Sequence, residues 1–189
     1  MAQRLILGVS GASGAPLAVE ALRQLHTRHP AVEVHLIVSR GGCLTLEQEC
    51  GLAPMDLAHL VHAIYTNDEI GAAPASGSFR TMGMLVVPCS MKTVAGVVSG
   101  YSDNLLLRAA DVTLKERRKL VLAARESPLS TIHLRNLYEA SKLGVVIAPP
   151  VPAWYRHPES MDDCVRHMAS RLLNHFGLDA DASQWEGLP

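Results

Sequence analysis

Aromatic residues are scarce in this sequence. They make up only 4% of the chain, which excludes a core built mainly from stacked rings. The 48% hydrophobic share must come chiefly from Ala, Val, Leu and Ile, which usually fill the space between parallel strands and crossover helices. Charged residues are also few, at 19%, whereas a disordered chain would be richer in charge. The composition therefore predicts an ordered α/β protein, and 189 residues fit a single domain.

The sequence also lacks an excess of charge, a long apolar run and a pattern of paired cysteines. The formal net charge is −1, so no global field attracts nucleic acid or an anionic membrane. No run approaches the roughly 18 apolar residues that a membrane-spanning helix needs. The four cysteines show no C-x-x-C spacing, and the start lacks the apolar stretch of a signal peptide. We therefore expect a cytoplasmic protein with reduced thiols that binds neither nucleic acid nor a membrane.

Short apolar runs alternate with helical patterns along the chain. This alternation favours a three-layer, doubly wound parallel sheet of the flavodoxin-like or Rossmann-like type. We expect a single domain over residues 1–189, with the segment from about 160 to 189 packing on a neighbouring subunit. Strands are predicted for residues 5–9, 32–38, 84–87, 120–123 and 145–148. Helices are predicted for residues 17–25, 40–49, 53–63, 91–98, 104–118, 131–142 and 161–176, with a functional loop over 67–81.

A turn of small residues follows the first predicted strand. Small side chains let the backbone approach a ligand closely and present N–H groups to a phosphate. The spacing G-x-x-G-x-x-G departs from both the dinucleotide-binding fingerprint and the P-loop. We interpret the turn as a phosphate cradle, and a tight turn without a ligand is the alternative. Its residues are Gly8, Ser10, Gly11, Ala12, Ser13 and Gly14.

A second turn of this kind has the sequence P-C-S-M-K-T over residues 88–93. Ser90 could cap the following helix and direct its N-terminal N–H groups toward an anion or a flavin ring edge. A capped helix without a ligand is the alternative. Two such turns at neighbouring strand ends would face one crevice, which favours a shared ligand. Arg125 and Glu126 also follow a predicted buried strand, at the end where α/β sites form.

The histidines and Cys89 are interpreted as structural residues. The nine histidines include the pairs His26/His29 and His59/His62, but no third ligand stands at recognisable zinc spacing. We therefore expect no metal site. Cys89 has no base placed beside it by the sequence, and a small buried thiol at a strand end is the commoner case.

Several segments together resemble the UbiX-type flavin prenyltransferases along almost the whole chain. They are GVSGASGA, the SR pair with Glu49 beyond it, ASGSFRT, MLVVPCSMKTVAG, RAADVTLKERRKLVLAARESPLSTIHL and PPVPAWYRHPESMDD. Their order and spacing are more specific than any single glycine turn. The resemblance implies an enzyme that transfers a dimethylallyl group from dimethylallyl (mono)phosphate to N5 and C6 of reduced FMN. The product, prenylated FMN, would serve a UbiD-type decarboxylase as the partner.

The resemblance also implies roles for individual residues. Ser13, Glu49 and Glu126 would be catalytic, the first two handling protons at the flavin and Glu126 assisting the departure of phosphate. No metal is implied, and the family's assembly is homo-oligomeric, often dodecameric. The implied FMN ligands are Gly11, Ala12, Ser13, Ser39, Ser90, Met91, Lys92, Thr93 and Arg125. The implied ligands of the prenyl phosphate are Lys115, Arg125, Tyr155 and Arg171.

Two alternative functions stay open at this point. An FMN-dependent cysteine-type decarboxylase would share the fold and oxidise a thiol substrate, but this chain has PCSMKT where that group shows a PASANT-like loop. A non-catalytic flavin carrier would bind FMN without any need for Glu49, Lys115 or Glu126. Substitution of those residues would therefore distinguish a carrier from a transferase.

Overall fold

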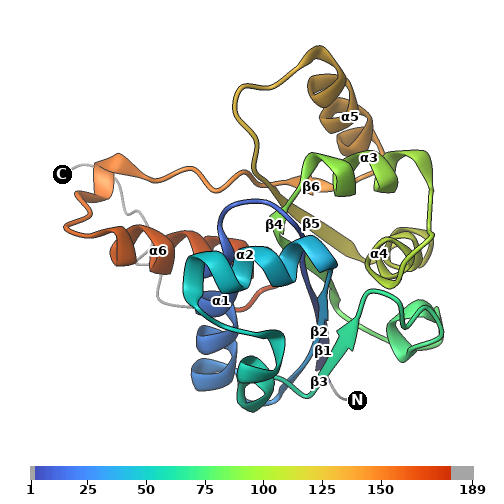
Figure 1. Cartoon of the computed structure of the whole chain (residues 1–189), viewed down its shortest axis with the longest axis horizontal. Coiled ribbons are helices and arrows are strands. Elements are labelled where there is room, and N and C mark those ends of the chain that lie inside the picture. The colour runs from blue at the N-terminus through green and yellow to red at the C-terminus, as the bar shows by residue number, and fades with distance from the viewer. Residues whose placement is uncertain (1–2, 180–189) are drawn as a thin grey trace.

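The structure, a computed structural model, describes residues 3–179 and is built around one parallel sheet (Figure 1). Its six strands lie in the order β3-β2-β1-β4-β5-β6. This is the order of Rossmann-type doubly wound sheets, in which the winding reverses between β1 and β4. The predicted α/β class is confirmed. The strands are β1 (Gln3–Val9), β2 (Val32–Val38), β3 (Ala63–Thr66), β4 (Gly83–Cys89), β5 (Lys119–Ala124) and β6 (Val146–Ile147).

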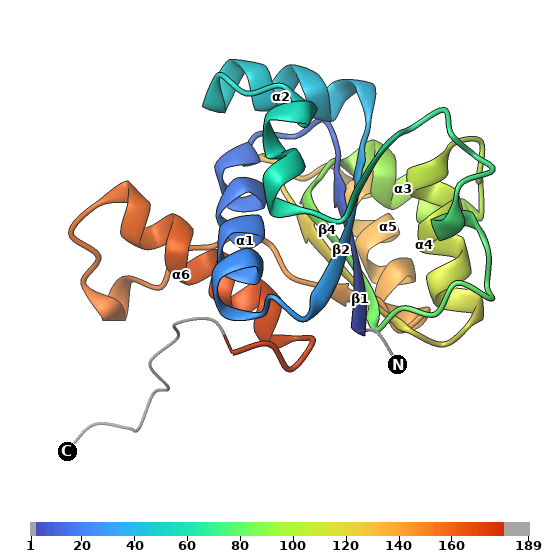
Figure 2. The same cartoon turned by 90° about the horizontal axis from the view of Figure 1, so that it is seen from below.

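Helices cover both faces of the sheet and make a three-layer molecule (Figure 2). One face carries α1 (Ala15–Arg28), α2 (Arg40–Cys50) and α6 (Met161–Asn174). The other face carries α3 (Met91–Ser99), α4 (Leu105–Lys115) and α5 (Thr131–Lys142). The 3₁₀ helices η1 (Pro54–Leu60), η2 (Ala73–Ala75) and η3 (Trp154–Arg156) lie in the connections.

The central strands are buried on both sides. In β1, Leu5 and Leu7 pack into the core on the α1 side, whereas Ile6 packs into the core on the α3 and α4 side. This alternation follows from the two-residue period of a strand. Because helices cover both faces, the strands are continuous apolar runs, and these runs are what made β1, β2, β4 and β5 predictable from the sequence.

The sequence did not predict β3, and the helix predicted for residues 53–63 is wrong over its last three residues. The 3₁₀ helix η1 ends at Leu60, and β3 begins at Ala63. Strand β3 lies at the edge of the sheet and pairs with β2 alone, so its side chains are only partly buried. Its apolar run, from Ala63 to Tyr65, is only three residues long and is too short to be recognised as a strand. The predicted helix over 104–118 is also too long, because the backbone of Arg117 takes a positive φ of 53° just after α4 ends.

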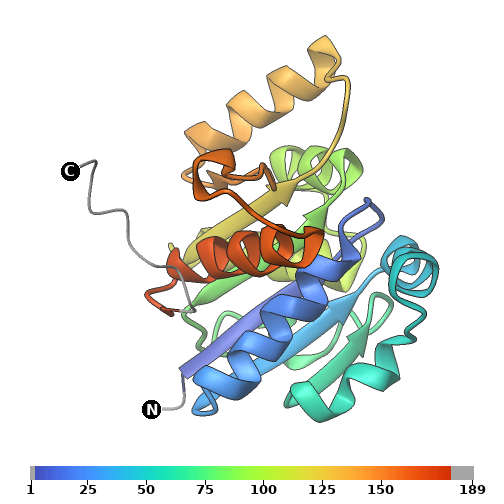
Figure 3. The ribbon, with the colours of Figure 1, turned by 90° about the vertical axis from the view of Figure 1, so that its left-hand side faces the viewer.

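Helix α6 packs on α1 of the same chain, and the two helices lie side by side in Figure 3. The Ser170 hydroxyl donates to Gln24 Oε1 over 2.9 Å, and Gln24 Nε2 donates to the Arg166 carbonyl over 3.0 Å. Leu172 and Leu173 complete the contact within the core. Packing of the C-terminal segment on a neighbouring subunit stays a prediction, and its last part, residues 180–189, lies outside the described residues. Within residues 3–179, no helix has the length and apolar character needed to cross a bilayer.

Candidate functional site

The loops that follow β1, β2, β4 and β5 meet at the carboxyl edge of the sheet. The Ser39 N–H donates to the Val9 carbonyl over 3.0 Å and joins the second loop to the first. The Arg125 N–H donates to the Cys89 carbonyl over 3.0 Å and joins the loop after β5 to β4. The structure therefore brings to one edge the residues predicted to hold FMN. They are Gly11, Ala12, Ser13, Ser39, Ser90, Met91, Lys92, Thr93 and Arg125.

Two glycines allow the first and second loops to touch backbone to backbone. A Cβ atom added to Gly11 would lie 3.0 Å from the Cα of Gly41, and one added to Gly41 would lie 2.9 Å from the Cα of Gly11. Any side chain at either position would push the loops apart. The glycine at position 11, predicted to let a ligand approach the backbone, is thus also required for the packing of the two loops.

The Glu49 carboxylate caps the N-terminus of α1. It accepts hydrogen bonds from the Gly14 N–H over 2.9 Å and from the Ala15 N–H over 2.8 Å. Burial alone would raise the pKa of Glu49, but hydrogen bonds from the Gly14 N–H and the Ser13 hydroxyl outweigh burial and lower it. The charge of Arg125 makes a smaller contribution that also lowers the pKa of Glu49. Ser13, Glu49 and Arg125 therefore lie close to one another, but the first N–H groups of α1 already have an acceptor.

The N-termini of α2 and α3 are capped by serine hydroxyls. Ser39 Oγ accepts from the Gly42 N–H over 3.0 Å, and Ser90 Oγ accepts from the Thr93 N–H over 3.3 Å. The predicted cap at Ser90 is confirmed. Among the described residues, the first backbone N–H groups of both helices have no recorded hydrogen-bond partner. Such N–H groups, at the positive end of a helix dipole, favour an anion. They belong to Arg40, Gly41, Met91 and Lys92.

Glu126 and Arg125 lie on an exposed loop at the same edge. Glu126 Oε1 accepts from the N–H of Ser127 over 3.1 Å. Cys89, by contrast, is fully buried at the end of β4, and burial raises the pKa of its thiol far above the ordinary value. The thiol is therefore protonated at neutral pH, which agrees with the structural role predicted for it.

Tyr155 and Arg171, two of the predicted phosphate ligands, line one cavity of about 220 Å³. Tyr155 lies on η3, Arg171 lies on α6, and the chain just after β6 forms another wall. His167 also lines this cavity, and its pKa is lowered by burial and by the charges of Arg156 and Arg171. A cavity lined by the Arg171 cation, beside a histidine that burial keeps neutral, is suited to a negatively charged group.

Lys115 lies at the amino ends of the strands, opposite the carboxyl edge of the sheet. It is the last residue of α4, close to the amino end of β5, and its ammonium contacts the Glu116 carboxylate. The neighbouring Arg118 donates to the carbonyls of Gly77 and Phe79 over 2.7 and 2.8 Å, in the loop that precedes β4. All six strands are parallel, so the amino ends of the strands, where Lys115 lies, are opposite their carboxyl ends. Within one chain, the structure does not bring Lys115 to the other predicted phosphate ligands.

Comparison with known proteins places the chain in a family. The family described as Flavoprotein matches residues 1–170. The Escherichia coli O157:H7 protein named "Probable UbiX-like flavin prenyltransferase" is 50% identical over 98% of this chain and 94% of its own length. The chain belongs to the UbiX-like flavin prenyltransferases. The predicted resemblance is confirmed.

Solved structures of UbiX-like proteins have the same fold as this chain. A dodecameric FMN-dependent UbiX-like decarboxylase from Escherichia coli O157:H7 superposes with a TM-score of 0.94 at 49% identity, covering 98% of this chain and 100% of the other. AnUbiX (PadA1), crystallised in complex with FMN and dimethylallyl pyrophosphate, superposes with a TM-score of 0.95 at 43% identity. That match covers 100% of both chains.

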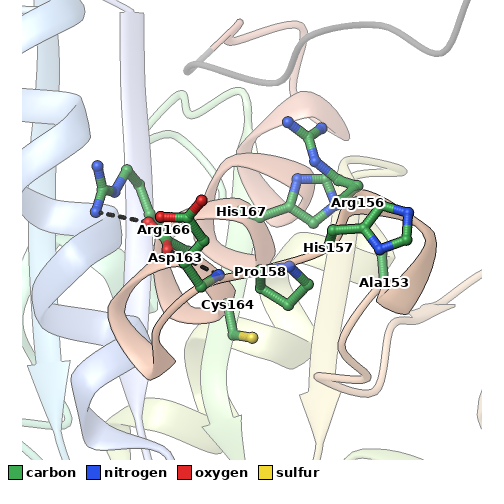
Figure 4. Close-up of a pocket in the computed structure, with 9 residues that line it drawn as sticks. Ala153, Arg156, His157, Pro158, Asp163, Cys164, Arg166 and His167 are labelled. Carbon is green, nitrogen blue, oxygen red and sulfur yellow. Dashed lines mark hydrogen bonds and ion pairs between the residues drawn. The ribbon is translucent and has the colours of Figure 1, made fainter.

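The UbiX-like chain has a second cavity, of about 440 Å³, that the sequence did not indicate (Figure 4). It lies between the segment around η3 and the first half of α6, and His167 lines it as well as the cavity of Tyr155 and Arg171. Its walls carry both signs of charge, including Arg156 and Asp163. The residues that line it are close in sequence, but they share no recognisable motif, so only the packing of the loop on α6 reveals the cavity. Among residues 3–179, no three His, Cys, Asp or Glu side chains are grouped to hold a metal ion.

Proposed function

We propose that this chain is a flavin prenyltransferase that transfers a dimethylallyl group from dimethylallyl phosphate to N5 and C6 of reduced FMN. The observation that carries the proposal is 50% identity over 98% of the chain to a UbiX-like flavin prenyltransferase. The complex of AnUbiX with FMN and dimethylallyl pyrophosphate supports the proposal that this chain binds FMN and a prenyl phosphate, because that structure superposes on the whole of this chain.

The residues at the carboxyl edge fit FMN. The contact between Gly11 and Gly41 leaves no side chain between the first two loops, and unpartnered N–H groups begin α2 and α3. We propose that these N–H groups, with Ser39, Ser90 and Arg125, hold the cofactor. Thr93 is only 7% exposed and acts through the Ser90 cap. Bound reduced FMN supplies the ring atoms that form the new bonds to carbon.

The proton chemistry is assigned to Ser13 and Glu49. Because its pKa is lowered, Glu49 is a carboxylate at neutral pH and is an acceptor of protons rather than a donor. Its hydrogen bond to Ser13 orients that hydroxyl, so the pair can receive a proton at the edge of the sheet. Glu126, exposed on the neighbouring loop, is the group proposed to assist the departing phosphate.

Arg125, Tyr155 and Arg171 are proposed to hold the prenyl phosphate. Departure of an allylic phosphate concentrates negative charge on the leaving group, so fixed cations lower that barrier. Lys115 can contribute only from a second copy of the chain, because its own site lies at the other edge of the sheet. We therefore propose that this chain forms a homo-oligomer and that neighbouring subunits of this oligomer complete each site. A dodecameric relative supports the oligomer.

The two alternative functions are less well supported. A cysteine-type decarboxylase would need a thiol substrate, while the full-length identity is to prenyltransferases. A flavin carrier has no use for an ionised Glu49 hydrogen-bonded to Ser13, or for a cavity lined by Tyr155 and Arg171. A UbiD-type decarboxylase as recipient of the product and a cytoplasmic location are part of the proposal. The location is supported by four free cysteines.

The test is anaerobic incubation of the protein with reduced FMN and either dimethylallyl phosphate or dimethylallyl pyrophosphate. We expect mass spectrometry to show a flavin heavier by one prenyl unit, and the two donors reveal which phosphate is used. Product formation should persist with a chelator, because side-chain cations stabilise the leaving group. Bound but unmodified FMN with both donors would contradict the transferase and favour the carrier.

A further inference from the structure

We infer that Ser10 is a positioning residue of the flavin site, whose hydroxyl ties the loop after β1 to the first turn of α3. Ser10 is not among the FMN ligands or catalytic residues assigned above. The inference rests on the proposed function, since it concerns how the chain prepares its site for FMN.

The Ser10 side chain lies between the two loops at the point where the winding of the sheet reverses. Its hydroxyl donates to the Pro88 carbonyl over 3.0 Å and accepts from the Ser90 N–H over 2.8 Å. The Ser10 N–H also donates to the Pro88 carbonyl, over 3.2 Å. Ser10 therefore bonds to Pro88, near the end of β4, through both its backbone and its side chain, and to Ser90, the cap of α3, through its side chain.

These contacts complete the N-terminal cap of α3. In a capping box, a Glu or Gln at the third helical position accepts from the N–H of the capping residue. In α3 that position is Thr93, whose N–H and hydroxyl both contact Ser90 Oγ, at 3.3 and 3.1 Å. The Ser90 N–H therefore needs an acceptor from outside α3, and the Ser10 hydroxyl is that acceptor. The cap of α3 is thus shared between two loops.

The shared cap determines where the free N–H groups of α3 point. Ser90 is held on its N–H by Ser10 and on its hydroxyl by Thr93, so the direction of the following Met91 and Lys92 N–H groups is set. Ser10 is only 2% exposed, and its hydroxyl already has a donor role and an acceptor role. It therefore acts on FMN through Ser90 and not by direct contact.

The test compares FMN affinity of the purified full-length protein and three variants by fluorescence quenching of FMN. Ser10→Ala removes the hydroxyl, and we expect about tenfold weaker FMN binding, the effect of one lost hydrogen bond. Ser10→Thr keeps the hydroxyl and should restore the affinity. In turnover assays the KM for FMN should rise in Ser10→Ala, while kcat at saturating FMN stays close to that of the wild type.

Ser170→Ala is the matched control, because Ser170 is also buried and bridges two elements, α6 and α1, away from the carboxyl edge. It should lower the melting temperature but leave FMN affinity unchanged. If Ser10→Ala does not fold, Ser10→Cys, with a weak acceptor of similar size, takes its place and should show the same loss. Unchanged affinity in the hydroxyl-free variant, or an equal loss in Ser170→Ala, would overturn the inference. FMN binding without prenyl transfer would refute the proposed function alone.

Discussion

At the scale of single residues, the group of Ser13, Glu49 and Arg125 combines a structural and a chemical role. Glu49 is an exposed residue, yet its carboxylate caps α1 and contacts Ser13. Solvent screens the charge, so its stabilising effect is that of an ordinary helix cap rather than of a buried ion pair. The same carboxylate is available to the proposed FMN site because it lies beside the loop after β1.

Glu49→Gln should reduce both stability and activity, since the amide keeps the shape but loses the charge. We expect a loss of about 1 kcal/mol in the free energy of unfolding, typical of a weakened helix cap, measured by urea denaturation. The rate of prenylation should fall by more than the loss of stability can explain. Glu47→Gln, an exposed neighbour on α2, is the control and should change neither quantity. Full activity of Glu49→Gln would remove Glu49 from the proton chemistry.

His35 should make the fold sensitive to acid. It is 8% exposed on β2, with Nδ1 3.0 Å from the Tyr65 hydroxyl. Burial lowers the pKa of His35 below its ordinary value of 6.5, so the unfolded chain takes up the proton first. Stability should therefore be complete above pH 6.5 and decrease as the pH falls below it. Chemical denaturation across pH 5 to 8 measures this, following the linkage between proton uptake and stability.

His35→Phe keeps a ring against Tyr65 and Phe79 but cannot be protonated. The pH dependence of its unfolding free energy should be flatter than that of the wild type. His26→Gln, at an exposed position on α1, should leave the pH dependence unchanged. An identical slope for wild type and His35→Phe would show that another group causes the acid sensitivity.

At the scale of elements, the site depends on how closely the loops after β1 and β2 approach each other. The contact of Gly11 with Gly41 is at backbone distance, and a Cβ on Gly42 would lie 2.4 Å from the Val9 carbonyl. The first turn of α2 is therefore pressed against the end of β1. Small changes in this region should alter ligand binding before they unfold the sheet.

Gly41→Ala should weaken FMN binding, because its Cβ at 2.9 Å from the Gly11 Cα forces the two loops apart. We expect a loss of about tenfold or more in affinity, corresponding to at least 1.4 kcal/mol, with the far-ultraviolet circular dichroism unchanged. Gly71→Ala is the control, since nothing lies within 4 Å of the added Cβ. Wild-type affinity in Gly41→Ala would show that the loops can separate without harm to the site.

At the scale of the whole molecule, one copy of the chain leaves its proposed phosphate ligands at two ends of the strands. Arg125 lies at the carboxyl edge and Lys115 at the amino edge. Large apolar side chains are also exposed around η3 and the start of α6, among them Trp154 at 72% and Met161 at 76%. Exposed apolar groups gathered in one region are typical of association surfaces. Both features favour an assembly that joins opposite edges of different copies.

Mixed oligomers should test this arrangement. Lys115→Ala and Arg125→Ala should each be inactive alone, but co-expression should restore activity, because some sites receive an intact Lys115 from one copy and an intact Arg125 from another. Random equal mixing would restore at most about a quarter of the sites. Mixing the two variants after assembly is the control and should restore less. Absence of recovery in co-expressed oligomers of native mass would contradict a shared site.

Much of the fold and part of the site could be predicted because they depend on neighbours in sequence. Buried parallel strands are continuous apolar runs, so β1, β2, β4 and β5 were recognisable. Ser90 was recognisable as a cap, because a cap bonds to an N–H three residues ahead. The glycine turn was recognisable as the turn between β1 and α1 for the same local reason.

Other features depend on residues that are distant in sequence and meet only in the folded chain. The acceptor for the N-terminal N–H groups of α1 is Glu49, 35 residues from Gly14. The Ser10 hydroxyl reaches Ser90 across 80 residues, and the cavity of Tyr155 and Arg171 needs α6 packed on the sheet. The edge at which Lys115 lies follows from strand direction, which a helical pattern does not contain. Local hydrogen bonding and hydrophobic periodicity thus determine elements and caps, whereas long-range packing determines which side chains share a site.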